Sequence, residues 1–297
     1  MQHIGEIAAL TTAFMWTIMG VLFESAGKRV GSLAVNFIRL SAGFIMLSIF
    51  TYFYRGYLLP IDATLHHWTW LGISGVIGFF FADLFLFQAY IEIGTRITML
   101  ILASGPPITS ILGFLFLNEN ISKISLLGML ITVSGIAIVI LSKDDDEENF
   151  KITYSIKGIT YAFLAALGNS VGMVFSKMGM GDYSPLAATQ IRIITGFISF
   201  VILFAYLNKW DDLKKAKSDK KAMKYIIIGS LFGPFLGVSL QLLSLQHTTA
   251  AISSTITSIM PVTILPFSVL VFKEKLKPKE IVGAIVSVIS VAILFLI

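Results

Sequence analysis

Long apolar runs separated by short polar stretches divide almost the whole chain into segments of similar length. The runs cover about residues 7–24, 35–54, 68–91, 98–117 and 126–141, then 156–176, 187–207, 223–244, 250–272 and 280–297. A helix that crosses the hydrocarbon core of a bilayer needs about 20 residues. Because backbone polar groups in lipid must be paired within their own segment, each run is predicted to be a helix. The pattern therefore predicts an all-α, polytopic membrane protein with about ten transmembrane helices.

Composition agrees with a membrane protein and excludes several other classes. Of the 297 residues, 56% are hydrophobic and only 13% are charged, whereas a soluble domain carries about 25% charged residues. The chain has no cysteine, which excludes disulfides and thiolate metal sites. No pattern typical of a metal site, a nucleotide site or a catalytic triad is visible, so we expect no cofactor, no metal and no enzymatic activity. The lysines lie in loops between apolar runs and indicate membrane topology, not a nucleic-acid partner.

The two halves of the sequence correspond to each other. Residues 34–44 (AVNFIRLSAGF) align with residues 187–197 (AATQIRIITGF), which pairs Arg39 with Arg192. Later in each half, the alignment pairs Pro107 with Pro261, Glu119 with Glu274, and Gly128 with Gly283. Such a repeat defines the architecture. We expect a first five-helix repeat at residues 1–142, an acidic linker at 143–154 and a second five-helix repeat at 155–297.

The number of helices in each repeat predicts how the halves thread the membrane. Five is odd, so the second half enters the bilayer in the opposite sense to the first. Inverted repeats that meet at the bilayer midplane are typical of secondary transporters, which bind their substrate between the repeats. Most of the 22 lysine and arginine residues lie in the odd-numbered loops or at the helix ends beside them; the exceptions are Arg39, Arg55, Lys123, Lys177 and Arg192. This bias predicts a multi-pass protein of the cell membrane with cytoplasmic odd-numbered loops and both termini outside.

Several motifs occur in duplicate and in the same order. Trp16 lies in the first expected helix, and each half has an arginine in its second helix, a proline in its fourth, and a glutamate-bearing turn, LNEN or FKEKL, followed by LLG or IVG. On these features the whole chain resembles the drug/metabolite transporter superfamily, specifically its ten-helix EamA-type permeases. The resemblance implies export or exchange of small organic solutes such as amino acids, nucleosides, nucleotide sugars or drugs. Two positions depart from the family pattern: Thr17 replaces a glycine, and Glu24 replaces a lysine that Lys177 keeps in the second half.

An acidic residue within the third apolar run is the first candidate for substrate binding or coupling. Asp83 shares a helical stripe with Phe79 and Phe87, and the repeat relates this stripe to one in the eighth run formed by Gly229, Gly233, Gly237 and Gln241. An acid in the middle of a bilayer costs about 2.5–3.5 kcal/mol, so Asp83 should face a partner or water. It would carry protons or anchor an ammonium group; alternatively, it is protonated or bonded to a neighbouring helix.

Three further candidates lie in the first, sixth and ninth expected helices. Trp16 lies far from either end of its helix, where an indole could stack on a substrate. Asn169 occupies the corresponding face of the sixth helix and could hydrogen-bond the substrate from the other half. Ser258 belongs to a small-residue stripe with Ala250 and Ser254. Plain helix packing is the alternative for all three.

The remaining charged candidates lie nearer the helix ends. Arg39 and Arg192 either extend to the interface or bond a neighbouring helix, or they contact an anionic group of the substrate. Glu24 and Lys177 lie near opposite membrane faces and could act in gating; simple exposure to solvent is the alternative. Glu119, like Glu274, is expected to bond backbone amides and fix the next helix.

Prolines in the fourth and ninth expected helices predict structural hinges. Pro107 and Pro261 lack the N–H that a helix interior requires, so they should break or kink their helices. Backbone carbonyls freed beside a cavity are used for binding in transporters with broken helices.

These features together predict a secondary transporter that works by alternating access on amino acids or related amine metabolites. Its partners would be the small-molecule substrate, the lipid bilayer and, if Asp83 carries them, protons. One alternative is a proton-coupled exporter of bulky apolar cations or drugs, which requires Asp83 and Trp16 to line one pocket. Another is a lipid flippase, which requires a lateral opening. A membrane-embedded enzyme would need a cluster of titratable groups at one depth, and the sequence shows none.

Overall fold

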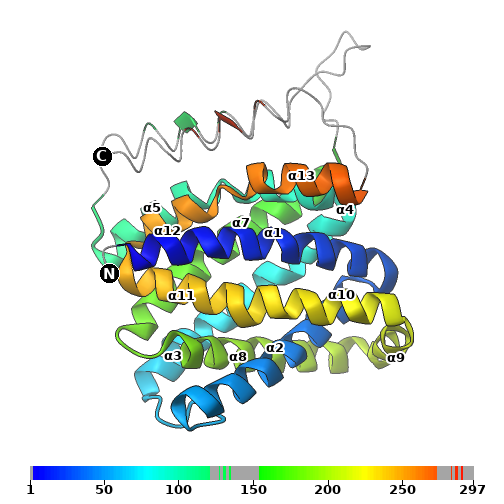
Figure 1. Ribbon diagram of the computed structural model, residues 1–297, viewed down its shortest axis with the longest axis horizontal. Helices are drawn as coiled ribbons and strands as arrows, with labels where there is room; N and C mark the ends of the chain where they lie inside the picture. Colours follow the sequence, from blue (N-terminus) through cyan, green and yellow to red (C-terminus); the bar gives the residue numbers. More distant parts are fainter. Residues whose placement is uncertain are drawn as a thin grey trace.

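The computed structural model describes residues 3–120 and 154–272, together with a few isolated positions between 127 and 134 and between 282 and 289. The first half contains α1 (Ile4–Val30), α2 (Ser32–Arg55), α3 (Leu65–Gly75), the π-helix η1 (Val76–Ala82), α4 (Asp83–Leu102) and α5 (Gly105–Leu117). The second contains α7 (Ile156–Met180), α8 (Pro185–Leu207), α9 (Trp210–Ser218), α10 (Lys220–Ser230), the π-helix η2 (Leu231–Gly237), α11 (Val238–His247), α12 (Ala250–Thr257) and α13 (Met260–Phe272). In Figure 1 the long helices lie side by side along the horizontal axis, which places the two ends of the bundle at left and right.

The described helices confirm an all-α, polytopic membrane protein. Seven helical segments are long and apolar enough to cross a membrane, and α5 is a shorter apolar helix. Several helices extend past their apolar runs, as α1 does to Val30 and α11 to His247, because water at the membrane interface can satisfy a helix end. The fifth and tenth expected helices, 126–141 and 280–297, lie outside the described residues, so the count of ten stays a prediction.

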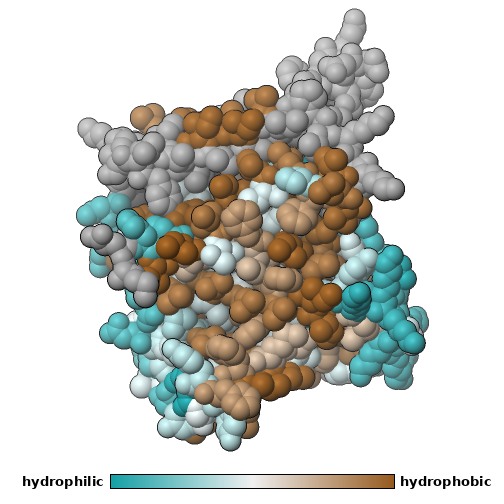
Figure 2. All heavy atoms as spheres, in the orientation of Figure 1, coloured by the Kyte–Doolittle hydropathy of each residue, from teal (hydrophilic) through white to brown (hydrophobic). Residues whose placement is uncertain are grey.

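The surface of the bundle is apolar across its middle and polar at both ends. Figure 2 shows hydrophobic side chains over the centre of this face and hydrophilic side chains at the left and right. Large apolar side chains such as Ile45, Phe114 and Ile202 remain exposed. Exposed apolar surface of this extent suits contact with lipid, not water.

Contacts at the two ends of the bundle show that the halves run in opposite directions. Near one end, Gly5 of α1 and Lys177 of α7 both contact Thr248. Near the other end, Gly27 of α1 and Gly158 of α7 both pack against isoleucines of α4. Therefore α1 begins at the end where α7 finishes. We call the end that contains Lys177 the Lys177 face and the opposite end, where Glu24 lies, the Glu24 face.

The first long helix of each half packs against the third segment of the other half. Helix α1 lies along α10, η2 and α11, as Figure 1 shows, and α7 lies along α3, η1 and α4. The predicted glycine stripe makes the first of these contacts possible, since each glycine faces a larger side chain of α1: Gly229 faces Phe23, Gly233 faces Met19 and Gly237 faces Trp16. A glycine face lets another helix approach closely.

Each half contains a π-helical segment at the corresponding position, which the sequence pattern did not predict. The segments η1 and η2 each interrupt the third long helix of their half. A π-helical turn inserts extra backbone and rotates the side chains that follow it, and such turns occur frequently at functional sites. In this protein Asp83 is the first residue after η1, and Val238 is the first residue after η2. The structure therefore pairs Asp83 with Val238, one position later than the sequence alignment, which pairs it with Gly237.

The fourth long helix of each half is broken near its middle. In the first half the break lies between α4 and α5, and in the second between α12 and α13. Pro107 and Pro261 lie in the first turn of α5 and α13, just after the breaks. Proline is tolerated there because the first N–H groups of a helix have no partner within it. A further bend at Gly94 (φ 77°) turns the chain from the third long helix into the fourth.

The lysine-rich stretch between α8 and α10 contains a helix that the apolar pattern did not indicate. Helix α9 buries Leu213 and Ala216, and the ring of Trp210 packs on Phe37 and Phe204. A short amphipathic helix of this kind gains its stability from the side that it packs on the bundle.

The close fit of α1 against the glycine stripe predicts a large effect of adding one methyl group. A Cβ atom on Gly229 would lie 2.4 Å from the Phe23 ring, which is buried and cannot move aside. We expect Gly229→Ala to lower the free energy of unfolding by about 1–3 kcal/mol through overpacking. The control is Gly72→Ala, whose Cβ would lie 3.4 Å from Thr195 and should change stability by no more than about 0.5 kcal/mol. Equal melting temperatures for the two variants in detergent would contradict this packing.

Candidate functional site

A cavity lies at the centre of the described helices, between the two halves. The cavity volume is about 110 Å³, counted as the space open to the centre of a water-sized sphere. One water molecule needs about 10–15 Å³ by the same measure. All eight residues that the sequence predicted for substrate binding or coupling line it: Trp16, Arg39, Phe79, Asp83, Asn169, Arg192, Gln241 and Ser258. The structure therefore brings these residues together, and their role in binding stays a prediction.

Most of the remaining wall is apolar, and the sequence analysis missed several of its residues. Met19 lies one helical turn from Trp16, and Tyr90 lies one turn from Phe87, so spacing along known stripes could have identified both. Pro234 of η2 also lines the cavity. No local signal marked it, because its position depends on the π-helical turn.

Arg39 and Asp83 form an ion pair between α2 and α4 beside the cavity. Arg39 Nη2 donates a hydrogen bond to Asp83 Oδ2, and Arg39 Nε donates to Asn36 Oδ1 at 3.0 Å. Asn36 Nδ2 in turn donates to the backbone carbonyl of Asp83 at 3.2 Å. Arg39 is only 2% exposed. Arg39 therefore bonds a neighbouring helix, and an extended position at the membrane interface is wrong, because Asp83 holds the guanidinium inside.

Arg192 approaches the same region from α8 without an equivalent partner. Its guanidinium carbon lies 4.9 Å from the centroid of the Phe79 ring, and the residue is 7% exposed. Asp83 is within electrostatic reach. Nevertheless, Arg192 Nε has no hydrogen-bond partner in the described parts of the chain. An extended position at the interface is wrong for this arginine too, because its side chain is buried against the cavity.

The second half supplies most of the neutral polar groups. Gln241 Nε2 donates to Ser253 Oγ at 3.0 Å, while Gln241 Oε1 has no hydrogen-bond partner among the described residues. Ser258 Oγ donates to the carbonyl of Thr255 at 2.7 Å at the end of α12, so its hydroxyl hydrogen is engaged within its own helix. Asn169 lies on the cavity wall between these groups and α4.

Glu24 lies between the cavity and the Glu24 face, where it is bound within its own half. Its Oε2 accepts hydrogen bonds from the backbone N–H of Thr95, at 2.6 Å, and from the Thr95 hydroxyl. Its Oε1 accepts from Lys28 Nζ at 2.5 Å. Glu24 therefore caps the helical segment that begins after Gly94. It is 1% exposed, so exposure to solvent is wrong.

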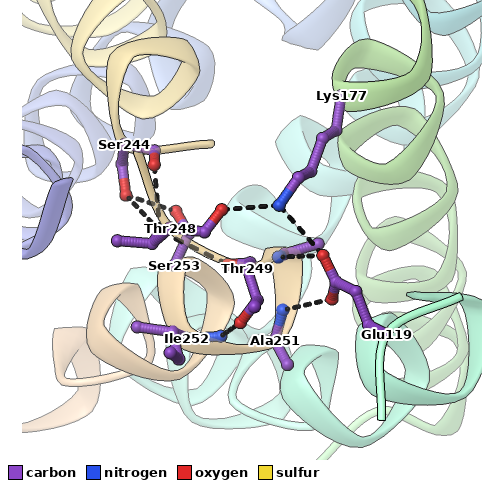
Figure 3. A network of polar contacts seen from close by, with 9 residues as sticks. Glu119, Lys177, Ser244, Thr248, Thr249, Ala251, Ile252 and Ser253 are labelled. Carbon is purple, nitrogen blue, oxygen red and sulfur yellow. Dashed lines mark hydrogen bonds and ion pairs between the residues drawn. The ribbon is translucent and has the colours of Figure 1, made fainter. Parts of the chain in front are cut away.

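Lys177 belongs to a polar network near the opposite face, shown in Figure 3. Its Nζ donates to the backbone carbonyl of Thr248 at 2.5 Å and to Glu119 Oε1 at 2.9 Å. Glu119 also accepts from the backbone N–H groups of Ala250, at 2.9 Å, and Ala251, at 3.5 Å. Glu119 therefore bonds backbone amides at the start of α12 in the other half. The expected bond to the next helix of its own half, at 126–141, concerns residues outside the described ranges. Glu274 lies outside the described residues.

A second contact at the Lys177 face also joins the halves. Asp62 Oδ1, from the loop after α2, accepts a hydrogen bond from the Tyr183 hydroxyl at 2.9 Å. Burial of Tyr183, together with this bond to Asp62, raises the pKa of the phenol to about 12. The hydroxyl therefore remains a donor at neutral pH.

Comparisons with known proteins agree with the architecture. A sequence model of the EamA-like transporter family matches the chain twice, over residues 3–141 and 156–296. YetK, an uncharacterized transporter of Bacillus subtilis (strain 168), is 22% identical over 209 residues, which cover 68% of this chain and 62% of YetK. The chain thus spans less than two thirds of that relative's length.

Another relative and a solved structure cover more of the chain. An uncharacterized transporter of Archaeoglobus fulgidus is 22% identical over 214 residues, covering 72% of this chain and 71% of that protein. A protein of known crystal structure superposes with a TM-score of 0.71 at 14% identity, covering 98% of this chain and 96% of the other. That likeness concerns the fold alone.

The charges beside the cavity predict an order of stability among three variants. Asp83 has two cations near it, whereas within the described part of the chain Asp83 is the only carboxylate near either arginine. Asp83→Asn should therefore be the most damaging change, at about 3–5 kcal/mol, because it leaves an unpaired buried charge. Arg39→Gln should be milder, since Arg192 remains near Asp83, and the double variant R39Q/D83N should be more stable than D83N. Melting temperatures in detergent test the order, and a double variant less stable than D83N would contradict it.

Proposed function

We propose that this chain, which belongs to the EamA-like transporter family of the drug/metabolite transporter superfamily, is a secondary carrier that moves small organic solutes by alternating access. Membership of this family makes the protein a membrane transporter and not an enzyme. The observation that carries the proposal is the central cavity, which receives polar side chains from two halves that run in opposite directions. Secondary transporters bind substrates and coupling ions at such an interface.

Amino acids and related amine metabolites are the substrates that we favour. The cavity combines aromatic and aliphatic surface with amide, hydroxyl and guanidinium groups, which suits a small solute with a polar head and an apolar side chain. Asp83 and Trp16 line the same cavity, as an exporter of bulky apolar cations would require. However, Arg39 occupies the carboxylate of Asp83, and Arg192 adds a second positive charge, so the electrostatics disfavour a cation.

The driving force is a gradient, either of the solute itself or of protons carried by Asp83. The sequence contains no ATP-binding motif. The charge bias of the loops supports a cytoplasmic position for the Glu24 face, which carries α9 and the other odd-numbered connections.

The polar groups at either end of the cavity support a gating role for Glu24 and Lys177. Lys177 lies one turn beyond the cavity-lining Met173, and Ala250 lies one turn before the cavity-lining Ser254. The network in Figure 3 therefore lies between the cavity and the Lys177 face. Because Glu119 and Lys177 come from different halves, movement of the halves apart at this face breaks their contact. Among the described residues Glu24 bonds groups of its own half, Thr95 and Lys28, so it stiffens the bend at Gly94 between the cavity and the Glu24 face.

Transport by the purified protein in proteoliposomes tests the proposed carrier. We expect counterflow of radiolabelled amino acids, screened beside amines, nucleosides and cationic dyes. Trp16→Ala removes an aromatic surface of the cavity and should lower the rate by about tenfold or more. Trp68→Ala, a change at a partly exposed tryptophan far from the cavity, is the matched control. Absence of counterflow for every class of solute would contradict the proposal.

The gate is tested by labelling a single cysteine, since the natural chain has none. Ser254→Cys places a thiol on the cavity wall. With this reporter, Glu119→Gln should increase labelling by a membrane-impermeant maleimide from the Lys177 face several-fold, because it weakens the contact between the halves. Labelling of whole cells and of inverted vesicles also identifies which side that face occupies.

Glu92→Gln is the control for this gate, because Glu92 carries an exposed pair with Lys157 at the Glu24 face. If E119Q labels no faster than E92Q from either side of the membrane, the network in Figure 3 does not act as a gate.

A further inference from the structure

The cavity wall carries more positive than negative charge. Asp83 is the only acidic residue among the described residues that line it, whereas Arg39 and Arg192 both do. The acids at the two ends of the cavity cannot compensate, because Glu24 is bound by Thr95 and Lys28. Glu119 is likewise bound, by Lys177 and α12. One of the two guanidinium groups therefore lacks its own carboxylate.

Arg192 is the arginine without a partner. No residue of the described ranges accepts a hydrogen bond from its side chain, and its Nε is buried and unsatisfied. A buried donor without a partner costs about 1–3 kcal/mol, and more when it is charged. Native proteins retain few such groups, and each calls for an explanation. Arg192 remains free because the position corresponding to Asp83 in the second half is Val238.

Two further polar atoms of the same cavity also lack partners. Within the ranges that the structure describes, Gln241 Oε1, on a residue only 3% exposed, accepts no hydrogen bond, and Thr109 Oγ1 has no hydrogen-bond partner either. Both residues line the cavity. The site thus offers an unused charged donor at Arg192 together with unused acceptors at Gln241 and Thr109.

We propose that the substrate carries a carboxylate that binds the guanidinium of Arg192, and an amino group that donates a hydrogen bond to Gln241 Oε1. This inference rests on the proposed carrier function and narrows its substrates to amino-acid-like solutes. A planar guanidinium binds a carboxylate through two parallel hydrogen bonds. Arg39 cannot offer the same fork, because Asp83 and Asn36 already occupy it.

The two binding groups lie at similar depth and on neighbouring helices. Arg192 and Gln241 each lie about two turns, or about 10 Å, inside the helix end at the Lys177 face. Helices α8 and α11 pack against each other. The side chain of the solute meets the apolar wall formed by Met19, Phe87 and their neighbours.

Binding of a matched series of solutes to the purified full-length protein tests the subsite. The series is leucine, its methyl ester, isoamylamine (leucine without the carboxylate) and 4-methylpentanoate (leucine without the amino group), with the corresponding derivatives of phenylalanine and methionine. Inorganic phosphate at the same ionic strength serves as a simple oxyanion. We expect the amino acids to bind best, and their esters and amines to bind about tenfold to a hundredfold more weakly.

Two variants separate the two contacts. Arg192→Gln should weaken the binding of both leucine and 4-methylpentanoate by about tenfold to a hundredfold and leave the binding of isoamylamine unchanged. Gln241→Ala should weaken the binding of leucine and leave the binding of 4-methylpentanoate unchanged. Arg29→Gln, which removes an arginine from a surface pair with Asp219, is the control for loss of charge. The unliganded R192Q protein should melt no lower than the natural protein, because Arg192 donates no hydrogen bond to the described helices.

The outcomes distinguish the subsite from the carrier. If the ester and the amine bind as tightly as the amino acid, or if R192Q changes nothing, the carboxylate subsite is wrong while the carrier can still stand. Equal binding of phosphate and leucine would assign Arg192 to simple oxyanions and overturn the proposal. If no solute of the series binds but a nucleoside or dye undergoes counterflow, the subsite is again wrong and the carrier survives. Absence of both binding and counterflow for all solutes contradicts both.

Discussion

The structure depends on keeping three charged side chains buried in the middle of a bundle that lipid surrounds. Each such charge costs about 2.5–3.5 kcal/mol in a bilayer unless partners or water compensate it. Asp83 compensates Arg39 directly, and Asn36 completes this link between α2 and α4. For Asp83 to reach Arg39, the chain must turn its side chain inward immediately after η1. The cavity, the close approach of α1 to the glycine stripe and the position of Arg192 are all arranged around this pair.

The two halves resemble each other more closely in backbone structure than in the positions of their charged side chains. Both halves contain a π-helical segment in the third long helix and a break in the fourth. The side chains at corresponding positions differ: Asp83 against Val238, and Glu24 against Lys177. At the Glu24 face, Glu24 caps the fourth long helix of the first half, to which Glu24 itself belongs. At the Lys177 face, Glu119 of the first half caps the fourth long helix of the second half. The two halves therefore combine a similar backbone with different charges at corresponding positions.

Arg192 illustrates how duplication can leave a buried charged side chain without a hydrogen-bond partner among the described residues. An arginine occurs in the second helix of both halves, yet only the first half supplies an acid to bind it. The guanidinium of Arg192 is buried over the Phe79 ring. Within the described residues, packing holds it and hydrogen bonds do not. The Arg192 guanidinium is preorganised for an anion. Binding an anion would neither break an existing hydrogen bond of this group nor immobilise a side chain that moves freely in water.

The sequence by itself predicted the long apolar helices, the opposite sense of the two halves and eight of the residues that line the cavity. The length of each apolar run and the odd number of runs per repeat follow from the local composition and from the thickness of the lipid bilayer. Neither requires knowledge of contacts between distant parts of the chain. The stripes through Asp83 and Gln241 follow from helical spacing alone. Only the tertiary structure decided that Arg39 is paired with Asp83 while Arg192 has no hydrogen-bond partner among the described residues, that Glu119 caps α12, and that a π-helical segment directly precedes Asp83. These outcomes depend on distances between helices far apart in the chain, and a difference of one residue in register changes which partner lies within hydrogen-bond reach.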